Sequence, residues 1–433
     1  MVLEPSLATR AAATDLIGDV LRVRRPFDTA FAGHRSIATM SARDRAFVHN
    51  LAITTLRRLG TIDHLVELCV ERPLPRRAQQ VRDILRVGSC QLLFMQVAAH
   101  GAVATCVELT RQLGHSAHIK LVNAVLRRLA RDGAKMIANL NESKVNTPDW
   151  LWKTWSTVYG EDVCHQMAAA HIAGAPLDIS TTGNPKTWAA ELGGDILFAN
   201  TIRLTGRGQV TELPGFQDGQ WWVQDAAAGL VANLAGDVTS KSVIDLCAAP
   251  GGKTSQFLTR GARVTAVDRS AARLERMGKN MERLGFKPRM IQADVTKWRP
   301  NKPADVVMLD APCSATGTAR RHPDVLWSKS ESDIAQLAAI QQGMMSAAAE
   351  SVAPGGLLIF ATCSLQPEEG IYHVSPFLDA HSRFKLEPLT AVDVHGLGET
   401  LTTCGCFRSL PSHHADRGGM DGFFAARFRR QAG

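Results

Sequence analysis

A glycine-rich turn that directly follows a short apolar segment sets the strongest limit on the fold of this chain. The segment Ser242–Leu246 has the length and the β-branched content of a buried strand. Gly251 and Gly252 follow it, and a helix is predicted to start at Thr254. Further strand patterns, separated by helical ones, recur at residues 263–267, 290–291, 304–309 and 356–360. This alternation predicts a doubly wound α/β sheet, which binds ligands at the carboxyl ends of its strands.

The length of the chain predicts more than one domain. A chain of 433 residues is expected to form two or three compact domains. The residues are 45% hydrophobic and 21% charged, as in a globular protein, and no apolar run is long enough to cross a bilayer. The first residues, Met1-Val2-Leu3-Glu4-Pro5, lack the basic and apolar segments of a secretory signal. Nine scattered cysteines fit a reducing compartment, so we expect a cytoplasmic protein with no membrane partner.

The positive charge of the chain is concentrated near its N-terminus. The net charge is +8, and residues 1–140 contain 20 Lys and Arg against 11 Asp and Glu. The rest of the chain contains 29 basic residues against 30 acidic ones. A polyanion is the natural partner of such a segment. A solvated basic surface on a helical domain would have the same charge, so the count alone leaves both interpretations open.

The same segment has the periodicity of successive helices. Pro73, Pro75 and the region of Gly33 separate the helical patterns, and Ser41 is a candidate N-cap. Strand alternation is absent. We therefore predict an all-helical domain over residues 1–140. Its apolar residues recur at helical spacing over residues 9–23, 45–59, 62–70, 77–97 and 118–129.

Residues 141–215 differ from both neighbouring regions. Asp149 opens a tryptophan-rich helical pattern, and short strand patterns follow at residues 176–179 and 201–204. We predict a small α+β connector here, followed by the α/β domain over residues 216–433. The tryptophans could stack on bases, but their spacing favours a place in the core.

Acidic residues follow the predicted strands of the α/β domain. Asp268 ends the second strand, where a carboxylate can accept hydrogen bonds from a ribose diol. A dinucleotide oxidoreductase would use the same geometry, but the turn lacks the Gly-x-Gly-x-x-Gly pattern. An alternative is that Lys253-Thr254 binds a phosphate, although the Walker pattern is also missing.

Two cysteines lie in separate motifs beyond these strands, and the order of the motifs resembles a known family. Cys313 follows Asp310-Ala311-Pro312, and Cys363 lies in Ala361-Thr362-Cys363-Ser364. With Asp245-Leu246-Cys247-Ala248-Ala249-Pro250-Gly251-Gly252-Lys253-Thr254, Ala293-Asp294 and Arg321-His322-Pro323-Asp324, they resemble the RsmB/Sun (Fmu) family of bacterial ribosomal RNA cytosine-5 methyltransferases. The helical segment, with Asp44-Arg45-Ala46-Phe47 and residues 121–128, resembles the NusB-like RNA-binding domain at the N-terminus of that family.

The resemblance implies a reaction. Members of such a family use S-adenosylmethionine to methylate carbon 5 of a cytosine in small-subunit (16S) ribosomal RNA. A thiolate adds to carbon 6 and makes carbon 5 nucleophilic, so a covalent cysteine–cytosine intermediate is implied. The chain departs from the family at Ala315, where glycine is more usual; the added methyl group restricts the backbone and leaves the chemistry intact.

The resemblance also implies the roles of individual residues. Cys363 is expected to be the nucleophile and Cys313 to assist proton removal and product release, whereas DNA cytosine-5 methyltransferases attack with the cysteine at the Cys313 position. Both thiols are expected to need lowered pKa values, with Lys253 a candidate for the cationic neighbour. Asp310 would lie between donor and cytosine and hydrogen-bond the base.

The cofactor residues follow in the same way. Asp268 would bind the ribose hydroxyls and Asp294 the adenine amino group, although either could instead cap a helix. The methionine and ribose end of S-adenosylmethionine would be held, together with Asp310, by Cys247, Ala248, Ala249, Pro250, Gly251, Gly252 and Lys253.

Other motifs predict less. Cys404-Gly405-Cys406 with His413-His414 lacks the paired Cys-x-x-Cys spacing of structural zinc, so we expect no metal. Residues 418–424 resemble the C-terminal turn and strand of the family, with the Phe pair packing the sheet. Gln224-Asp225 resembles a family motif that supports the active site, and we expect it to do so without contacting the substrate. We expect a monomer that acts on ribosomal RNA.

Two rival functions can be compared with the motifs. An RNA-binding regulator with an inactive methyltransferase fold should lack a catalytic cysteine or Asp310, and all three are present. A DNA cytosine methyltransferase would need a target-recognition region between its motifs, but only 50 residues separate Cys313 from Cys363. The sequence therefore favours RNA as the substrate.

Overall fold

Packing divides the chain into two compact units. The computed structural model describes residues 4–205 and 209–432; Met1–Leu3, which entered the argument against a secretory signal, lie outside this part. The helical unit comprises Met1–Ala173 and Ala319–Lys329, and the sheet unit comprises Gly174–Thr318 and Ser330–Gly433. The predicted domain boundaries at 140/141 and 215/216 differ from these two units in kind, because they divide the sequence by its pattern, and they stay predictions.

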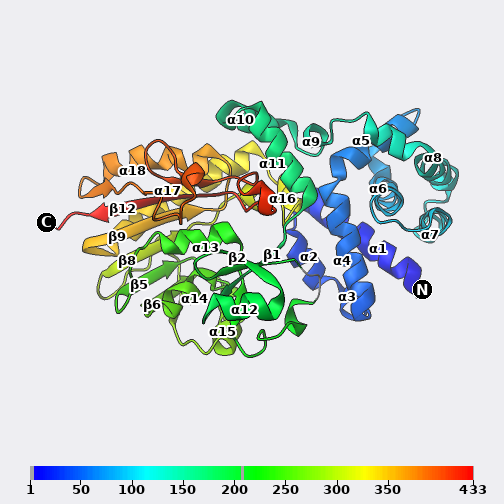
Figure 1. Cartoon of the computed structure of the whole chain (residues 1–433). Helices are drawn as coiled ribbons and strands as arrows, with labels where there is room; N and C mark the ends of the chain where they lie inside the picture. The colour runs from blue at the N-terminus through cyan, green and yellow to red at the C-terminus, as the bar shows by residue number, and fades with distance from the viewer. Residues whose placement is uncertain (1–3, 206–208, 433) are drawn as a thin grey trace. The chain divides into compact units, whose positions relative to one another are not determined.

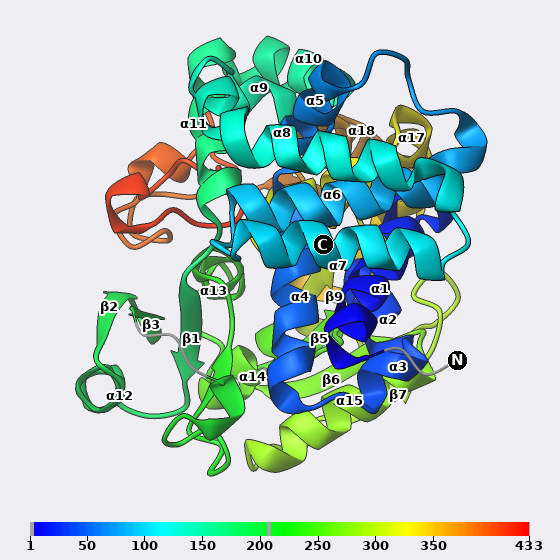
Figure 2. The same ribbon diagram turned by 90° about the vertical axis from the view of Figure 1, so that its right-hand side faces the viewer.

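The helical unit is built around amphipathic helices. Figure 2 shows α6, α7 and α8 side by side. Val122, Val125 and Leu129 lie on one buried face of α8, and Ser41 caps α4 by accepting the Asp44 N–H. The helices are α1 (Pro5–Gly18, followed by a π-helical turn, Asp19–Val23), α2 (Phe27–Gly33), α3 (Arg35–Ala38), α4 (Ala42–Arg57), α5 (Leu59–Cys69), α6 (Gln79–Leu93), α7 (Ala99–Gln112), α8 (Ile119–Ala138), α9 (Glu142–Val145), α10 (Asp149–Tyr159), α11 (Glu161–Ala173) and α16 (Asp324–Ser328).

The predicted helical segments are confirmed, with differences at their ends. The segments over residues 9–23, 45–59, 62–70, 77–97 and 118–129 correspond to α1 with its π-turn, α4, α5, α6 and α8. The sequence reasoning did not single out α2, α3 or α7. Trp152 and Trp155 are buried in α10, as expected for core residues.

A segment from the far end of the chain completes the helical unit. The Trp327 indole N–H donates to the Leu56 carbonyl at 2.9 Å. Arg57 donates to the Arg320 carbonyl at 2.7 Å, and the Phe27 N–H donates to the Asp324 carboxylate at 3.0 Å. Three contacts therefore fix Ala319–Lys329 against α2 and α4.

The sheet unit contains a mostly parallel sheet with helices on both faces (Figure 1). Its strand order is β10-β12-β9-β8-β5-β6-β7, with β11 paired to β12, and β12 runs antiparallel to β9. The strands are β5 (Ser242–Leu246), β6 (Arg263–Asp268), β7 (Arg289–Gln292), β8 (Ala304–Asp310), β9 (Val352–Thr362), β10 (Phe384–Leu386), β11 (Phe407–Ser409) and β12 (Phe423–Arg430).

Alternate residues of these strands feed two cores. Val243 and Val306 pack with α13 (Ala226–Asn233) and α14 (Gly252–Thr259) on one face, where α15 (Ala271–Arg283) also packs. Ile244 and Val307 pack on the other face with α17 (Glu331–Glu350) and α18 (Val374–Ala380). The period of two therefore makes the sheet doubly wound, as predicted.

A second, smaller sheet belongs to the same unit. Its order is β2-β3-β1-β4, formed by β1 (Leu177–Thr181), β2 (Gly194–Phe198), β3 (Thr201–Leu204) and β4 (Trp221–Val223), with α12 (Pro185–Leu192) beside it. Ile179, Ile202 and Trp221 form its core. The two strands predicted in the connector are confirmed as β1 and β3. No helix in the described part of the chain has the length and apolarity needed to cross a membrane.

Trp327→Phe should destabilise the helical unit by about 1 kcal/mol, because the ring is largely kept while the Leu56 carbonyl loses its hydrogen-bond donor. Urea unfolding of the full-length protein, followed by far-ultraviolet circular dichroism, measures the change. Trp150→Phe is the matched control in the same unit, since no hydrogen bond of the Trp150 indole is recorded among the described residues. An equal loss in the two variants would contradict this role of Trp327.

Candidate active site

The strand register brings three loops to one edge of the sheet. β5 and β8 are parallel neighbours with Leu246 opposite Leu309, and β8 and β9 are parallel neighbours with Asp310 opposite Ala361. The chain order reverses between β5 and β8, since β6 and β7 continue on the other side of β5. This is the switch point at which doubly wound sheets bind ligands. The predicted motifs after β5, β8 and β9 therefore meet there.

The two predicted cysteines are adjacent. The sulfur atoms of Cys313 and Cys363 lie 3.4 Å apart, and both residues are half-buried. The hydrogen bond with Cys363, followed by burial, raises the pKa of Cys313 well above its ordinary value. The expectation that both thiols have lowered pKa values is therefore wrong for Cys313, because its closest partner is a second sulfur that competes for the same negative charge.

A buried cation lies beside this pair. The Lys253 ammonium is 2.6 Å from the Asp310 carboxylate and 5.3 Å from the centre of the Phe423 ring. Burial disfavours its charge, but Asp310, and after it Asp245 and Cys363, outweigh burial and raise the pKa of Lys253. The lysine therefore stays protonated beside the Asp310 carboxylate.

The glycine-rich turn shapes the neighbouring loop. Gly251 has a φ of 105°, in the left-handed region, and a Cβ there would lie 2.8 Å from Met281. The Thr254 hydroxyl donates to the Asp245 carboxylate at 2.5 Å, while Asp245 Oδ1 is buried without a partner among the described residues. Burial raises the pKa of Asp245 to about 7 and that of the Cys247 thiol to about 12, so Cys247 is not a nucleophile at neutral pH.

The other two predicted cofactor carboxylates differ in exposure. Asp268 is buried, and its oxygens accept the N–H groups of Ser270 at 2.9 Å and Ala249 at 3.3 Å. Asp294 is exposed, and Thr296, which donates both its hydroxyl and its N–H, lowers the Asp294 pKa. Each carboxylate therefore also orders its own loop, and the assignment of both to ribose and adenine stays a prediction.

The loop after Cys313 contains the departure from the family pattern. Ala315 has a φ of 60°, the conformation that glycine adopts without strain, so its methyl group costs about 1 kcal/mol. Gly317 follows, and a Cβ there would lie 1.9 Å from the Gly422 carbonyl oxygen. Its N–H donates to the Cys363 carbonyl at 3.0 Å, which joins the loops of the two cysteines.

The supporting motifs have structural partners. Gln224 donates to Gln256 at 2.8 Å, and Asp225 caps α13 and accepts the Asp421 N–H at 3.0 Å. Phe423 and Phe424 are buried in β12, as expected.

The two cysteines near the C-terminus contact each other. The sulfurs of Cys404 and Cys406 are 3.6 Å apart, and His413 accepts the Leu410 N–H. No group of three or more His, Cys, Asp or Glu side chains in the described residues is arranged to bind a metal ion.

The sequence reasoning missed a buried polar cluster behind the cysteines. Glu369 accepts hydrogen bonds from Ser314 and Ser364, the residues that follow Cys313 and Cys363. It lies in Pro367-Glu368-Glu369, a stretch that reads as an ordinary polar turn. Only the folded chain brings it to both loops.

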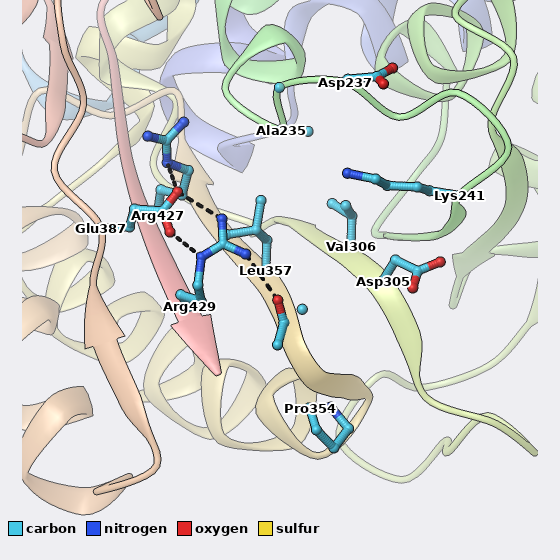
Figure 3. A pocket seen from close by; sticks show the side chains of 13 residues that line it. Ala235, Asp237, Lys241, Asp305, Val306, Pro354, Leu357, Glu387, Arg427 and Arg429 are labelled. Atoms are coloured by element: carbon cyan, nitrogen blue, oxygen red, sulfur yellow. Dashed lines mark hydrogen bonds and ion pairs between the residues drawn. The ribbon is translucent and has the colours of Figure 1, made fainter. Parts of the chain in front are cut away.

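A separate cavity of about 350 Å³ lies at the other edge of the same sheet (Figure 3). Lys241 and Asp305 line it at the amino ends of β5 and β8. Glu387 pairs there with Arg427 and Arg429. The cavity is therefore far from the switch point along the strands and is not the predicted site.

Comparison with known proteins identifies the family. The model described as 16S rRNA methyltransferase RsmB/F matches residues 234–429, and the NusB family model matches residues 7–131. A probable ribosomal RNA small subunit methyltransferase B from Synechocystis is 31% identical over 98% of this chain and 100% of its own length. This chain belongs to the 16S rRNA methyltransferase RsmB/F family. The ribosomal RNA small subunit methyltransferase B of Xanthomonas campestris is 35% identical over 82% of this chain and 84% of its own.

Solved structures support the fold. The crystal structure of PH0851 covers 99% of this chain and 100% of its own, with a TM-score of 0.76 and 22% identity. NSun6 from Pyrococcus horikoshii with SFG covers 65% and 98%, with a TM-score of 0.55 and 19% identity. The predicted RsmB/Sun family, the NusB-like helical region and the α/β methyltransferase fold are therefore confirmed.

Asp245→Asn should change how the stability of the sheet unit depends on pH. The pKa of Asp245 is about 7 when folded and about 4 when unfolded, so between these values the folded state holds a proton that the unfolded state has released. The stability from this group is complete below about pH 4 and disappears as the pH rises through about 7. Asparagine stays neutral and still accepts the Thr254 hydroxyl.

Denaturant unfolding at several pH values between 5 and 8 tests this expectation. The variant should gain stability relative to the wild type as the pH rises. A difference that stays constant over this range would show that Asp245 does not titrate there.

Proposed function

We propose that this protein transfers the methyl group of S-adenosylmethionine to carbon 5 of a cytosine in small-subunit (16S) ribosomal RNA. The family is that of 16S rRNA methyltransferases. The observation that carries the finer proposal is the pair of sulfurs 3.4 Å apart at the switch point, beside the Lys253–Asp310 ion pair. Carbon 5 of cytosine needs nucleophilic activation from carbon 6, and a thiol pair beside a cation is suited to supply it.

The surroundings of the two thiols support a division of roles between them. Lys253 attracts a thiolate at Cys363, whereas Cys313 is held as a thiol because its pKa is raised. We therefore assign Cys363 as the nucleophile and Cys313 as the group that assists the later elimination. The same inference disfavours a DNA-type mechanism, in which the cysteine at position 313 would attack.

The residues at the switch point fit S-adenosylmethionine. This molecule has several hydrogen-bond donors, and three carboxylates lie at or near the carboxyl ends of three neighbouring strands: Asp245 one residue before the end of β5, Asp268 at the end of β6 and Asp294 just after β7. Asp245 Oδ1 is buried and has acceptor capacity to spare. Asp268 would bind the ribose and Asp294 the adenine amine, while residues 247–253, with Asp310, would surround the methionine end. The bound molecule supplies an electrophilic methyl group.

These positions support the following proposed reaction. The Cys363 thiolate adds to carbon 6, Asp310 accepts a hydrogen bond from the exocyclic amine, and a proton from the Lys253–Asp310 pair moves to N3 as negative charge develops in the ring. Carbon 5 then takes the methyl group, whose bond to the sulfur of the donor breaks, and retains its proton until a base removes it. Loss of this proton restores the double bond and breaks the bond between sulfur and carbon 6. Cys313, in contact with Cys363, is placed to assist this elimination.

The helical unit supplies a surface for the RNA backbone. Residues 1–140 contain the whole positive excess, and Lys120, Arg127, Arg128, Arg131 and Lys135 are exposed on α8. We propose that this unit binds ribosomal RNA phosphates, and that the protein acts as a cytoplasmic monomer without a metal.

Substitution of each thiol should separate the two roles. Cys363→Ala should abolish methylation and the covalent adduct, because no carbon 5 nucleophile forms without addition. Cys313→Ala should still add and transfer the methyl group but stall before elimination, so a protein–RNA adduct that survives boiling in detergent should accumulate. Gel electrophoresis with RNA and methyl-labelled donor measures both, and the label should be in the adduct.

The double variant and a reaction without donor are the controls. An adduct from Cys363→Ala but not from Cys313→Ala would reverse the two roles. The absence of an adduct in every variant, with methylation intact, would contradict covalent catalysis.

Replacement of the exposed basic residues of α8 by neutral ones should weaken RNA binding, because fewer phosphate charges are neutralised. Replacement of Lys120, Arg127, Arg131 and Lys135 by Gln should reduce the slope of log affinity against log salt by about 0.7 to 0.9 for each phosphate that is no longer neutralised. Binding of a small-subunit RNA fragment at several salt concentrations measures this slope.

The control replaces four exposed basic residues of the sheet unit, Lys241, Lys302, Arg383 and Lys385, in the same way. An equal change in both variants would mean that α8 has no special part in RNA binding. Substitution is preferred to deletion of residues 1–140, since Ala319–Lys329 packs against that segment.

A further inference from the structure

A fully buried carboxylate joins the loops of the two cysteines. Glu369 has no exposed surface. Its Oε2 accepts the Ser314 hydroxyl at 2.5 Å and the Ser364 hydroxyl at 2.6 Å. Its Oε1 accepts the Ser314 N–H at 2.9 Å and the Gln341 amide at 3.0 Å. One oxygen therefore binds a hydroxyl from each cysteine loop.

Gln341 and His373 extend this hydrogen-bond network. Gln341, on α17, also donates to the carbonyl of Pro312 at 2.9 Å, the residue before Cys313. His373 contacts the Gln341 side-chain oxygen at 2.9 Å, and burial lowers the pKa of His373 to about 4, so the ring is neutral at pH 7. Cys313 is thus held on both sides, through Pro312 and through Ser314.

A buried carboxylate would be an unfavourable choice if this cluster served only to stabilise the fold. A buried carboxylate loses its hydration, and none of the four donors to Glu369 within the described residues is a charged group. Two neutral side chains could fill the same space without that cost. What a carboxylate offers is acceptor capacity at both oxygens, which lets it bind donors from two loops at once.

We propose that Glu369 is a positioning residue that holds Cys313 and Cys363 at the separation needed for addition and elimination. It acts through Ser314 and Ser364 and does not itself touch the substrate. The catalytic part of this inference rests on the proposed function. The structural part concerns only the distance between the two sulfur atoms.

Glutamine at position 369 would lose the acceptor that the two serine hydroxyls share. With its amide oxygen toward the Ser314 N–H and the Gln341 amide, its nitrogen would donate toward the Ser314 and Ser364 hydroxyls, which would have to turn from donating to accepting. Glu369→Gln keeps the size of the side chain and removes the shared acceptor. It should therefore loosen the loops with little change in packing volume.

A dithiol cross-linker reports the separation without any RNA. Dibromobimane joins two close thiols: each sulfur displaces one bromide to form a thioether, and fluorescence appears when both have reacted. The background for all variants is Cys404→Ser, because Cys404 and Cys406 are themselves 3.6 Å apart. Peptide mapping by mass spectrometry verifies that Cys313 and Cys363 are the joined residues.

We expect Glu369→Gln to slow this cross-link and to lower kcat for methyl transfer by roughly tenfold to a hundredfold, the loss that a misplacement of about 1 Å produces. The KM for RNA and the affinity for S-adenosylmethionine should stay within about twofold, since the binding surfaces are untouched. Glu368→Gln is the matched control, because Glu368 is half-buried and is not a recorded partner of Ser314 or Ser364.

Ser364→Ala provides a second variant if Glu369→Gln fails to fold, which circular dichroism would reveal. It removes one donor from the Cys363 loop and leaves Glu369 three others, so it should slow cross-linking in the same direction. Wild-type rates of cross-linking and kcat in both variants would overturn the proposal. A wild-type protein that cross-links but never methylates cytosine would instead defeat the proposed function, and the cross-linking comparison would still decide the role of Glu369.

Discussion

The parallel pairing of β8 with β9 is the constraint on which the candidate active site depends. Because Asp310 lies opposite Ala361, Cys313 and Cys363 leave the sheet at the same edge after three and two further residues. Side chains alternate between the faces of a strand, so a shift of one residue in this register would exchange the two cores and separate the thiols. Burial on both faces, with Val307 and Leu358 on one side and Met308 and Ile359 on the other, therefore fixes the chemistry as well as the fold.

The groups around Cys313 and Cys363 differ, although the two side chains are identical. The sulfurs of Cys313 and Cys363 share one contact, but Lys253 lies near Cys363 and the Glu369 carboxylate is among the groups that raise the pKa of Cys313. In the proposed reaction Cys363 attacks as a thiolate, and Cys313 can lose its proton and act as a base only after addition has removed the neighbouring negative charge. The asymmetry comes from one cation and one anion placed near the pair, and not from the cysteines themselves.

The sequence was sufficient to predict the features that depend on a repeating pattern or on the order of motifs. The short apolar strands, the glycine turn and the motif order predicted the sheet, and Cys313, Cys363, Asp310 and Lys253 do meet at one place. The sequence could not predict the raised pKa of Cys313, because this depends on a sulfur 50 residues away. It also could not single out Glu369, since a glutamate after a proline looks like a solvated turn until Ser314 and Ser364 surround it. Patterns predict elements, whereas contacts between loops come only from their packing.

The chain passes from the sheet unit into the helical unit and back shortly after Cys313. The loop that begins at Cys313 passes through Gly317, which bonds to Cys363, and the next residues, from Ala319, are already part of the helical unit. Trp327 and Arg320 in this segment are held by carbonyl contacts with α4, and the chain returns to the sheet unit at Ser330. Loss of the helical unit would leave Trp327 and Arg320 without these partners, on a segment that starts six residues after Cys313. The segment that follows the cysteine loop therefore depends on the helical unit for its packing, and the same unit carries the positive charge of the chain.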